Sequence, residues 1–497
     1  MKRTPPPAST PPRRVLIIGS EALPFSKTGG LADVLGALPA ALARLGWDVT
    51  VAIPKYRGGA DGTLLERFPV TVGGFTRDVS FIEAPLDDGA RAWLVDCPDL
   101  FDRDALYGTG GTDYPDNARR FAMLVRAAFE FAGRQASPPS IVHAHDWQAG
   151  LAPVYLKTLY AAHPMLGGVP SVFTIHNLAY QGLFDGDWLP RLDLGWELFT
   201  MARLEYWGRM SFLKGGINFA EIVTTVSPRY AQEIQTPELG FGFDGILRQR
   251  RANLVGILNG IDPREWDPAR DRFLPEPYGV QTLAGKKAAK AAVLGRYGLP
   301  TDEAAMKRPL VGMVSRMVDQ KGLDLIAALA GRLLALDACF VVLGTGEARY
   351  QDFWRALAAR APMRVGVNIG FDEGLAHLVE GGADIFLMPS RFEPCGLNQM
   401  YSMRYGTVPV VHGVGGLADT VVNYAPGNTR STGFVMAAYT RAALVEALNR
   451  ALVVYADPRA WPTLQMAGMQ QDFSWDRSAQ EYVKIYERAI RGRKAQG

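Results

Sequence analysis

The sequence predicts an α/β protein of two domains, each built on a doubly wound and mostly parallel sheet. Short apolar runs alternate with longer amphipathic stretches along the whole chain, which is the pattern of strands joined by crossover helices. With 497 residues, the chain is too long for one ordinary hydrophobic core. The five-residue sequence Gly29–Asp33 occurs again as Gly415–Asp419, each time at an expected helix start. This repetition favours two similar halves that face a deep cleft, a kind of place where ligands bind.

The expected strands are short apolar runs bounded by turn residues. In the first half they lie at Val15–Gly19, Ile141–Ala144, Ser171–Ile175, Ile222–Val226 and Leu254–Leu258. In the second half they lie at Leu310–Ser315, Cys339–Leu343, Val365–Gly370, Ile385–Met388 and Val408–Val411. Three segments of the second half are expected to be helices, namely Leu323–Leu336, Ala348–Arg360 and Gly396–Tyr405.

The domain boundaries follow from turn residues and changes in composition. Residues 1–13 are rich in proline and basic residues but lack the apolar centre of a secretory signal, so we expect a disordered tail. The first domain is expected at 14–258 and the second at 259–475, because turn residues and a charged, proline-rich passage follow Asn259. The segment 476–497 contains an amphipathic stretch, and we expect it to form a helix that packs back on the first domain.

Composition excludes several classes of protein. The 53 basic and 50 acidic residues nearly cancel, which predicts neither a nucleic-acid track nor a membrane-binding face. No run reaches the roughly 18 apolar residues of a membrane-spanning helix, so a soluble protein is expected. Cys97, Cys339 and Cys395 are far apart and form no CxxC pair, which disfavours a disulfide framework or a zinc site. A reducing cytoplasm suits this use of cysteine.

The first glycine-rich turn predicts an anion site. Gly29 and Gly30 allow backbone N–H groups to approach a ligand closely, the helix start at Leu31 offers its positive end, and Lys27 adds a charge. A phosphate group is the expected ligand. The alternative is a tight turn with a solvated lysine.

Two cations follow a strand of the second half. Arg316 comes directly after the strand Leu310–Ser315, and Lys321 lies five residues later, where the next helix begins. Open α/β sheets bind ligands at the carboxyl ends of their strands, so this pair also points to phosphate. Solvated surface charges are the alternative.

A carboxylate follows another strand of the second half. Glu393 and Cys395 lie in a turn between the strand Ile385–Met388 and the next helix. A carboxylate does not suit phosphate, but it accepts hydrogen bonds from a neutral polyol such as a sugar. The alternative is an acidic residue favoured by the helix dipole, which contributes up to about 1 kcal/mol without a ligand.

Histidines gather at the ends of two strands of the first half. His143, His145 and Asp146 end one strand and His176 ends another, at the same expected sheet edge. Two histidines on one strand face and a nearby carboxylate raise the question of a metal, but no further residue completes a ligand set. Such histidines are more often part of the core, or support the site residues from behind, than they are metal ligands.

Two other classes of protein compete with a phosphate and sugar enzyme. Gly240–Gly245 matches the dinucleotide fingerprint, but no strand precedes it, and Gly413–Ala418 lacks the acidic residue about 20 positions later that would hold a ribose. A glycan-binding protein without catalysis would tolerate loss of Lys27, Arg316 or Lys321, and all three are present.

These motifs resemble those of bacterial glycogen synthases and plant starch synthases, retaining glycosyltransferases of the GT-B fold with two Rossmann-like domains. Tyr401 stands eight residues after Glu393, where many other retaining GT-B enzymes carry a second glutamate, and this is typical of the subgroup. The likeness extends over nearly the whole chain, through Ser20–Gly30, Asp113–Asn117, His143–Trp147, Thr225–Pro228, Asn259–Asp262, Ser315-Arg316 with Gln320–Gly322, Glu393–Leu397 and Phe473–Ser478.

The resemblance implies transfer of glucose from ADP-glucose to the non-reducing 4-hydroxyl of an α-1,4-glucan such as glycogen, with retained configuration and release of ADP. It implies no cofactor and no metal. The first domain would be the starch synthase catalytic domain on the glucan side, and the second a glycosyltransferase group 1 domain on the nucleotide-sugar side. Same-face attack is the favoured route to retention, and a covalent intermediate is the alternative. Preference between ADP-glucose and UDP-glucose, oligomeric state, regulation and acceptor length are left open by the sequence.

The same resemblance assigns roles to individual residues. The implied catalytic residues are Glu393, His176, Asp146, Arg316 and Lys321. Those implied to bind ADP-glucose are Lys27, Gly29, Gly30, Arg316, Lys321, Gly344, Glu393, Cys395, Gly396, Leu397, Gly415 and Gly416. Those implied on the acceptor side are Asp33, Tyr107, Asn117, Asp146, Trp147 and Asn177.

Overall fold

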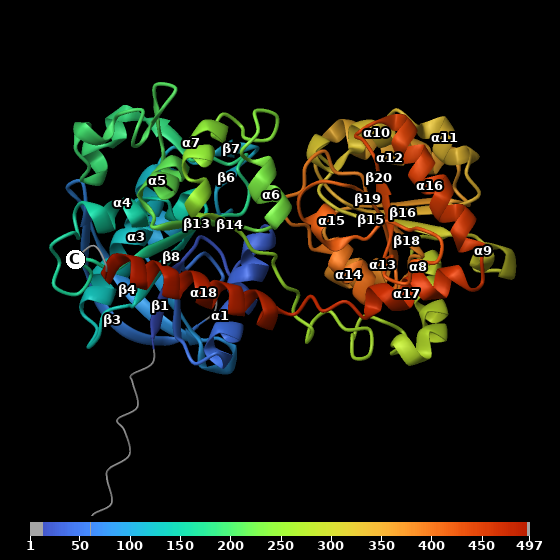
Figure 1. Ribbon diagram of the computed structural model, residues 1–497, viewed down its shortest axis with the longest axis horizontal. Helices are drawn as coiled ribbons and strands as arrows, with labels where there is room; N and C mark the ends of the chain where they lie inside the picture. The colour runs from blue at the N-terminus through green and yellow to red at the C-terminus, as the bar shows by residue number, and fades with distance from the viewer. Residues whose placement is uncertain (1–12, 60, 495–497) are drawn as a thin grey trace, which may run out of the picture. The chain divides into compact units, whose positions relative to one another are not determined.

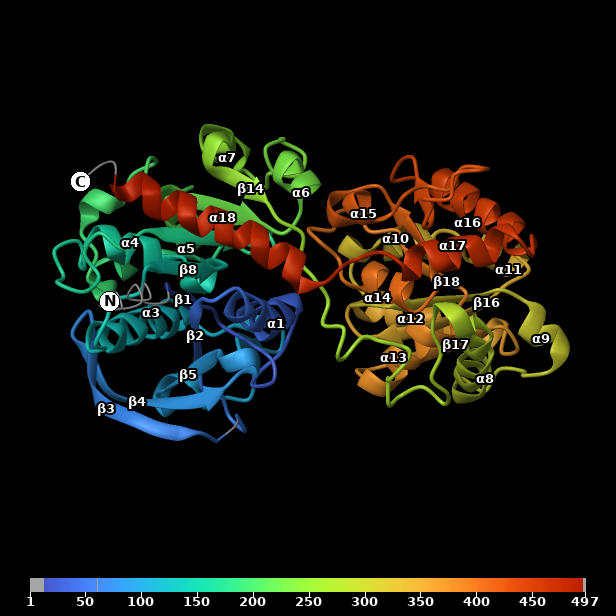
Figure 2. The ribbon, with the colours of Figure 1, turned by 60° about the horizontal axis from the view of Figure 1, so that its bottom comes forward.

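The computed structural model describes residues 13–59 and 61–494. The tail expected at 1–13 lies outside them, apart from Arg13. The described residues form two compact units, drawn in Figures 1 and 2 with the colour running from blue to red along the chain. The first unit consists of residues 13–226, 234–260 and 475–494, and the second of residues 227–233 and 261–474.

A nine-stranded sheet forms the centre of the first unit. Its strands follow the order β14-β13-β9-β8-β1-β2-β5-β4-β3, and every neighbouring pair from β14 to β5 is parallel. The strands are β1 Arg14–Ile18, β2 Asp48–Pro54, β3 Thr63–Val72, β4 Phe75–Pro85, β5 Arg91–Asp96, β8 Ile141–His145, β9 Ser171–Ile175, β13 Ile222–Thr225 and β14 Leu254–Gly256.

The antiparallel edge formed by β3 and β4 is a feature that the sequence analysis did not predict. Both strands are long, and in β3 buried residues alternate with exposed ones because only one face of this ribbon meets the core. The Phe68 ring of β3 stacks on Phe81 of β4, with centroids 5.3 Å apart, and on Phe131 of the helix α3 Asn117–Gly133. The ribbon therefore extends the parallel sheet without a second covering layer.

Helices cover both faces of the parallel part of this sheet. Two smaller sheets complete the unit, one of β10 Leu183–Asp185, β12 Arg209–Ser211 and β11 Glu205–Tyr206, the other of β6 Gly108–Thr109 and β7 Thr112–Asp113. The helices are α1 Gly30–Arg44, α2 Pro98–Phe101, α3 Asn117–Gly133, α4 Leu151–Lys157, α5 Phe212–Phe219, α7 Asp244–Gln249 and α18 Trp475–Lys494.

The last helix, α18, belongs to the first unit although it follows the whole of the second unit in sequence. It lies beside α1 and across β8, as Figures 1 and 2 show in red. Tyr482 and Tyr486 are fully buried in a core shared with Val15, Ile17 and α1. The Tyr486 ring meets Trp47 edge-on at 5.2 Å, and its hydroxyl bonds His143 Nδ1 at 2.8 Å. One side chain thus joins the helix to the apolar core and to the histidine strand.

A six-stranded, fully parallel sheet forms the centre of the second unit, in the order β17-β16-β15-β18-β19-β20. Successive residues of a strand contribute to different cores: Phe340 and Val342 to one, and Val341 and Leu343 to the other. The sheet is therefore covered on both faces. The strands are β15 Leu310–Val314, β16 Cys339–Gly344, β17 Val365–Ile369, β18 Ile385–Met388, β19 Val408–His412 and β20 Phe434–Met436.

Two expected helices of the second unit differ from the observed ones. The segment expected as one helix at Leu323–Leu336 forms two, α10 and α11, because Leu329 leaves helical geometry with φ −115° and ψ 12°. The helix expected from Gly396 begins two residues later, since Gly396 has φ +69°, outside the α-helical region. The helices are α6 Pro228–Glu233, α8 Lys286–Arg296, α9 Glu303–Lys307, α10 Leu323–Ala327, α11 Ala330–Ala335, α12 Ala348–Arg360, α13 Glu373–Gly382, α14 Asn398–Arg404, α15 Gly415–Thr420, α16 Arg441–Tyr455 and α17 Ala460–Met469.

The packing of α18 predicts a specific loss of stability. Tyr486→Ala removes a fully buried ring, and we expect the free energy of unfolding of the first unit to fall by about 3 kcal/mol or more. Tyr486→Phe removes only the hydroxyl bound to His143 and should cost about 1 to 2 kcal/mol. Urea unfolding followed by tryptophan fluorescence measures both.

The control for this prediction is Lys484→Ala on the same helix, where the side chain is exposed. A surface change of this kind should alter the free energy of unfolding by less than about 0.5 kcal/mol. Equal effects of the Tyr486 and Lys484 variants would contradict the packing described here.

Candidate functional site

The candidate residues of the second unit lie where its parallel strands end. Arg316 follows β15, Gly344 ends β16, Glu393 follows β18 and Gly415 follows β19. These four strands are neighbours in the sheet and run in the same direction. Their carboxyl ends therefore meet at one edge, which is where open α/β sheets bind ligands.

An ion pair joins the two central residues of this edge. Lys321 Nζ lies 2.6 Å from Glu393 Oε2, and Ser390 Oγ donates to the same oxygen at 2.9 Å. Both side chains of the pair are mostly buried, with 18% of Lys321 and 7% of Glu393 exposed. Among the described residues none donates to Glu393 Oε1. The carboxylate is thus fixed through one oxygen while the other is available to accept a hydrogen bond.

Arg316 lies at the same edge with its side chain exposed. Its guanidinium reaches Gln320 Oε1 at 3.4 Å, a long contact that places the cation beside the turn carrying Lys321. That turn ends at Gly322, where φ is +77° and a Cβ atom would lie 2.1 Å from the Pro389 carbonyl oxygen. The two cations and the Glu393 loop are therefore held together by a close backbone approach that only glycine permits.

The second glycine pair packs directly against the Glu393 loop. A Cβ atom at Gly415 would lie 1.9 Å from the Glu393 carbonyl oxygen, and one at Gly416 would lie 2.0 Å from the Cys395 carbonyl oxygen. The Gly416 N–H donates to the Glu393 carbonyl at 3.1 Å. These glycines let the start of α15 approach the Glu393–Cys395 backbone closely.

Glu233 meets the first N–H group of α15, a contact that the sequence analysis missed. The Gly415 N–H donates to the Glu233 carboxylate, 3.0 Å from Oε2, and Arg229 Nε holds the same carboxylate at 2.9 Å. Asp419 of the same helix accepts hydrogen bonds from Ser227 Oγ and the Arg229 N–H in return. An anion does lie at this helix start, as expected, but in this structure it is a side chain.

The remaining candidates of the second unit lie in and around the loop before α14. The Cys395 thiol is buried, and the Gln399 amide donates to the carbonyls of Cys395 and Gly396 at 3.1 and 3.0 Å. Leu397 directly precedes α14 and is partly exposed. A Cβ atom at Gly344 would lie 1.9 Å from the Ser315 carbonyl oxygen, so Gly344 lets the ends of β15 and β16 approach each other.

Tyr401, which replaces a second glutamate, lies in an aromatic stack. Its ring lies 3.7 Å from the Trp266 ring at an angle of 9°, and Trp266 in turn stacks on His377 at 3.8 Å. The position eight residues after Glu393 is therefore part of the support beneath the loop and carries no carboxylate.

The first glycine turn is exposed in the first unit. Lys27 Nζ pairs with Asp33 Oδ1 at 2.6 Å, which joins the last residue of the repeated sequence to a lysine just before it. Gly29 precedes α1 and Gly30 begins it, and both face solvent. The backbone of this turn is accessible to an anionic ligand, and the Lys27 charge is balanced by Asp33 in this structure.

Glu21 supports the same turn and was not singled out from the sequence. It is 3% exposed, and its Oε2 accepts hydrogen bonds from the Thr28 N–H at 2.5 Å and the Thr28 hydroxyl at 2.8 Å. Burial raises the pKa of this carboxyl to about 7 against the opposing effect of the Thr28 hydrogen bonds. In the sequence, only the position of Glu21 within the Ser20–Gly30 motif could have indicated this role.

Asp146 lies between the two histidine-bearing strands in an unusual backbone conformation. Its φ is +55°, a region that residues other than glycine rarely adopt. Its N–H donates to the Thr174 carbonyl at 2.9 Å, and Oδ1 accepts the His176 N–H at 2.7 Å. Burial raises the Asp146 pKa to about 7, although the backbone hydrogen bonds from His176 and Asn177 oppose it. The carboxyl is therefore poised to exchange a proton near neutral pH.

The histidines beside Asp146 are neutral, with His143 and His145 fully buried and His176 half-buried. His145 Nδ1 lies 2.9 Å from His176 Nε2, and His143 Nε2 lies 2.6 Å from Thr174 Oγ1. Burial lowers the pKa of His143 and of His176 to about 3. His143 bonds Tyr486 and Thr174 at its two ring nitrogens, so it is a structural residue behind His145 and His176.

The other acceptor-side candidates differ in their exposure. Asn117 is buried and donates to the Tyr107 carbonyl at 2.9 Å, so it positions the Tyr107 loop. The Tyr107 hydroxyl bonds Ser20 Oγ at 2.8 Å. The Trp147 ring is 8% exposed and meets Phe121 edge-on at 5.1 Å. Asn177 is partly exposed, and its Oδ1 accepts the Ala179 N–H at 3.0 Å.

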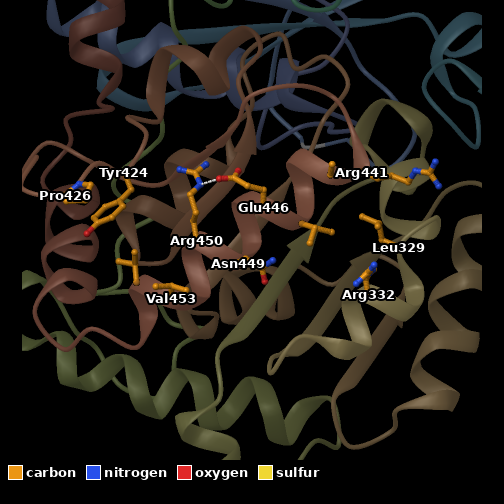
Figure 3. A pocket seen from close by; sticks show the side chains of 12 residues that line it. Leu329, Arg332, Tyr424, Pro426, Arg441, Glu446, Asn449, Arg450 and Val453 are labelled. Carbon is orange, nitrogen blue, oxygen red and sulfur yellow. Dashed lines mark ion pairs between the residues drawn. The ribbon is translucent and has the colours of Figure 1, made fainter.

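The candidates thus form two sets, one in each unit. A cavity of about 850 Å³ in the second unit contains none of them; it is lined by α16 residues such as Arg441 and Val453 and by Tyr424. Figure 3 shows the side chains that line it, with Arg450 paired to Glu446. The first set is Lys27, Gly29, Gly30, Asp33, Tyr107, Asn117, Asp146, Trp147, His176 and Asn177, and the second is Arg316, Lys321, Gly344, Glu393, Cys395, Gly396, Leu397, Gly415 and Gly416.

Comparisons with known proteins show the family of the chain. The family described as "Starch synthase catalytic domain" matches residues 14–249, and "Glycosyl transferases group 1" matches residues 301–461. The chain is 48% identical over 482 residues to a glycogen synthase of Koribacter versatilis, covering 96% of this chain and 98% of that one. It is 50% identical over 474 residues to a glycogen synthase of Anaeromyxobacter dehalogenans, covering 95% and 99%. The chain belongs to the glycogen and starch synthase family.

Solved structures extend the comparison to the fold. The catalytic domain of starch synthase IV from Arabidopsis thaliana, solved with ADP and acarbose, matches with a TM-score of 0.88 and 32% identity over 97% of this chain and all of that one. A sucrose-phosphate synthase from Thermosynechococcus elongatus matches with a TM-score of 0.61 at 17% identity, which shows the fold alone. The chain is a glycosyltransferase of the GT-B fold, as the sequence predicted. Among residues 13–59 and 61–494, no helix combines the length and the apolar character needed to cross a membrane.

The raised pKa of Asp146 predicts a pH-dependent contribution to stability. Between its ordinary pKa of 3.8 and the folded value of about 7, the folded chain binds more protons at this group than the unfolded chain. The contribution of the Asp146 carboxyl to the free energy of unfolding is therefore fully present below about pH 4 and is lost as the pH rises to about 7. Asp146→Asn mimics the neutral acid, so we expect the stability of the wild type relative to this variant to fall over this pH range.

Chemical denaturation at several pH values measures the difference between the two proteins. Asp185→Asn, at a carboxylate whose side chain is 83% exposed, is the control and should give a nearly pH-independent difference. Parallel stability profiles for the wild type and Asp146→Asn would show that the carboxyl titrates normally.

Proposed function

We propose that this glycosyltransferase transfers glucose from ADP-glucose to the non-reducing 4-hydroxyl of an α-1,4-glucan, with retained configuration and release of ADP, in glycogen synthesis. The observation that carries the proposal is the Lys321–Glu393 pair at the carboxyl edge of the second sheet. A cation and a sugar-binding carboxylate side by side suit a ligand with a phosphate next to a neutral sugar.

The second unit, expected at residues 259–475, is the nucleotide-sugar side in this proposal. Negative charge develops on the diphosphate as the bond to the anomeric carbon breaks, and Lys321 and Arg316 are the cations that stabilise it. Glu393 Oε1 accepts hydrogen bonds from glucose hydroxyls, while Oε2 keeps the Lys321 ammonium in place. With two cations at the leaving group, the proposed reaction proceeds without a metal ion.

The first unit, expected at residues 14–258, is the glucan side. The protonated Asp146 carboxyl can donate a hydrogen bond to a sugar oxygen, and the neutral His176 imidazole offers a donor and an acceptor without a charge. Lys27 and the N–H groups of the Gly29-Gly30 turn offer a further anion site on this unit.

Same-face attack accounts for the retained configuration. The bond from the anomeric carbon to the phosphate oxygen breaks, the bond to the acceptor O4 forms on the same face, and the hydroxyl proton passes to the leaving phosphate. Glu393, bound to Lys321 and Ser390, is occupied as a hydrogen-bond acceptor, and Tyr401 stands where a second carboxylate could have served as nucleophile. Capture of a covalent glycosyl-enzyme adduct would refute this route.

We also propose that the enzyme works in the cytoplasm. All three cysteines lie in the described part of the chain, are buried and form no disulfide, and this use of cysteine suits a reducing compartment. ADP-glucose and glycogen are the proposed small-molecule and polymer partners. Neither a nucleic acid nor a membrane has a part in the proposal.

Nucleotide release tests the proposed reaction. ADP should be released from ADP-glucose when glycogen is added, in the presence of EDTA, and the glucan should grow in length. The same assay with UDP-glucose tests which nucleotide sugar is the donor. If UDP is released faster than ADP, the donor is UDP-glucose and the proposed donor is wrong. A folded protein that binds glycogen but releases neither nucleotide would instead be a glycan-binding protein without catalysis.

Substitution of the central ion pair tests the assigned roles. Lys321→Ala and Glu393→Ala should each lower kcat by about 100-fold or more, because each removes a group proposed to contact the reacting sugar diphosphate. Steady-state kinetics with ADP-glucose and glycogen, with circular dichroism to check the fold, measure the effect.

The matched controls are Lys307→Ala and Glu303→Ala. These residues form another lysine–glutamate pair of the second unit, 2.6 Å apart, but in exposed positions on α9. Loss of such a pair costs little and should leave kcat unchanged. Near-normal turnover of either Lys321→Ala or Glu393→Ala would remove that residue from the mechanism.

A further inference from the structure

His377 is a buried histidine of the second unit that the proposed reaction does not use. It lies in α13 with 1% of its surface exposed, and Trp266 stacks on one face of its ring at 3.8 Å. Its Nδ1 lies 2.8 Å from Asp271 Oδ2. The ring is thus fixed in both position and rotation.

Asp271 determines which nitrogen of His377 carries the proton. The same Oδ2 accepts the Tyr405 hydroxyl at 2.5 Å, while Oδ1 accepts the Phe273 N–H at 2.8 Å. A carboxylate already held by two donors acts as an acceptor toward His377, so the imidazole proton is on Nδ1. The lone pair of the ring is therefore on Nε2.

The Nε2 atom of His377 is buried and has no hydrogen-bond partner among the described residues. A buried polar atom without a partner lowers the stability of the folded protein by about 1 to 3 kcal/mol. A ligand bound to Nε2 would remove this cost. A histidine that donates Nδ1–H to a carboxylate and offers Nε2 to a cation is the arrangement that recurs at metal sites.

Two carboxylates complete the cluster around this histidine. Glu265, Glu373 and His377 each offer a ligand atom, and these three atoms all lie within 4.8 Å of one another. Glu373 precedes His377 by one helical turn of α13, and Glu265 comes from the turn that carries Trp266. Two separate segments of the second unit thus bring donors to one point.

We propose that Glu265, Glu373 and His377 bind a divalent transition-metal ion, with Zn²⁺ as the best match. One imidazole and two carboxylates form a ligand set that zinc accepts, with a fourth position for water. Zinc ligands at about 2.0–2.2 Å lie about 3.4 Å apart in a tetrahedron, a spacing that the carboxylates can reach by small side-chain movements. Glu373 is exposed in the first turn of α13 and has the freedom to do so.

The bound ion would fasten the Glu265–Trp266 turn to α13. Trp266 lies between His377 and Tyr401, so the ion would stabilise the aromatic stack beneath the loop that carries Glu393. The site is a structural one, and it is independent of the proposed reaction. Glycosyl transfer in the presence of EDTA is therefore compatible with this metal site.

A metal titration tests the proposal. The protein is stripped with EDTA, desalted and titrated with ZnCl₂ in competition with a chromophoric chelator, and Co²⁺ serves as a spectroscopic probe. We expect one equivalent to bind tightly, Co²⁺ to give the visible absorption of a low-symmetry site, and Zn²⁺ to raise the Tm of the stripped protein.

Variants identify the ligands. Glu373→Gln and Glu265→Gln should each weaken Zn²⁺ binding at least about 10-fold and abolish the rise in Tm. Glu303→Gln, at the same first-turn position of α9, is the matched control and should bind as the wild type does. His377→Gln should also abolish Zn²⁺ binding at this site. If this variant unfolds because a buried ring is lost, Glu373→Gln and Glu265→Gln still test the proposed ligands. Equal affinity of the wild type and Glu373→Gln would overturn the proposal and leave an adventitious ion only.

Discussion

The pairing of Lys321 with Glu393 is the interaction on which the donor side of this protein depends. It joins the turn after β15 to the loop after β18, two segments that are 72 residues apart in sequence but adjacent in the parallel sheet. The pair is buried enough to be well defined, and each charge offsets the desolvation of the other. Glycines at 322, 415 and 416 permit the backbone approaches that hold the loop in this position.

The two copies of the repeated glycine turn show how the same five residues acquire different contacts. In the first unit Asp33 pairs with Lys27, and the turn stays exposed. In the second unit Asp419 accepts from Ser227 and Arg229, and the Gly415 N–H meets the Glu233 carboxylate. The helix start attracts a negative group in the second copy because its N–H groups lack partners within the helix. Which anion occupies that position depends on residues that the repeat does not contain.

The candidate residues of the two units differ in chemical character. The first unit keeps a carboxyl with a pKa near 7 beside neutral histidines, where burial disfavours every charged form. The candidate residues of the second unit include the Lys321–Glu393 ion pair and the exposed Arg316 guanidinium. A neutral, hydrogen-bonding surface suits a glucan, and a charged one suits a diphosphate. The difference follows from pairing, because Glu393 lies against a cation while Asp146 accepts a backbone N–H group.

The sequence by itself determined the fold class, the parallel strands and the chemistry-bearing residues, because apolar periodicity and the glycine, lysine and glutamate motifs are local patterns. The extent of each domain and the roles of the individual residues stay predictions. Only the tertiary structure decided which candidates are buried, as Asn117 is, and which partners they meet, as Lys321 meets Glu393. It also revealed the β3–β4 ribbon, Glu21, Glu233 and the His377 cluster. These features rest on contacts between residues far apart in the chain, and burial and pairing of that kind leave no local signature in a single sequence.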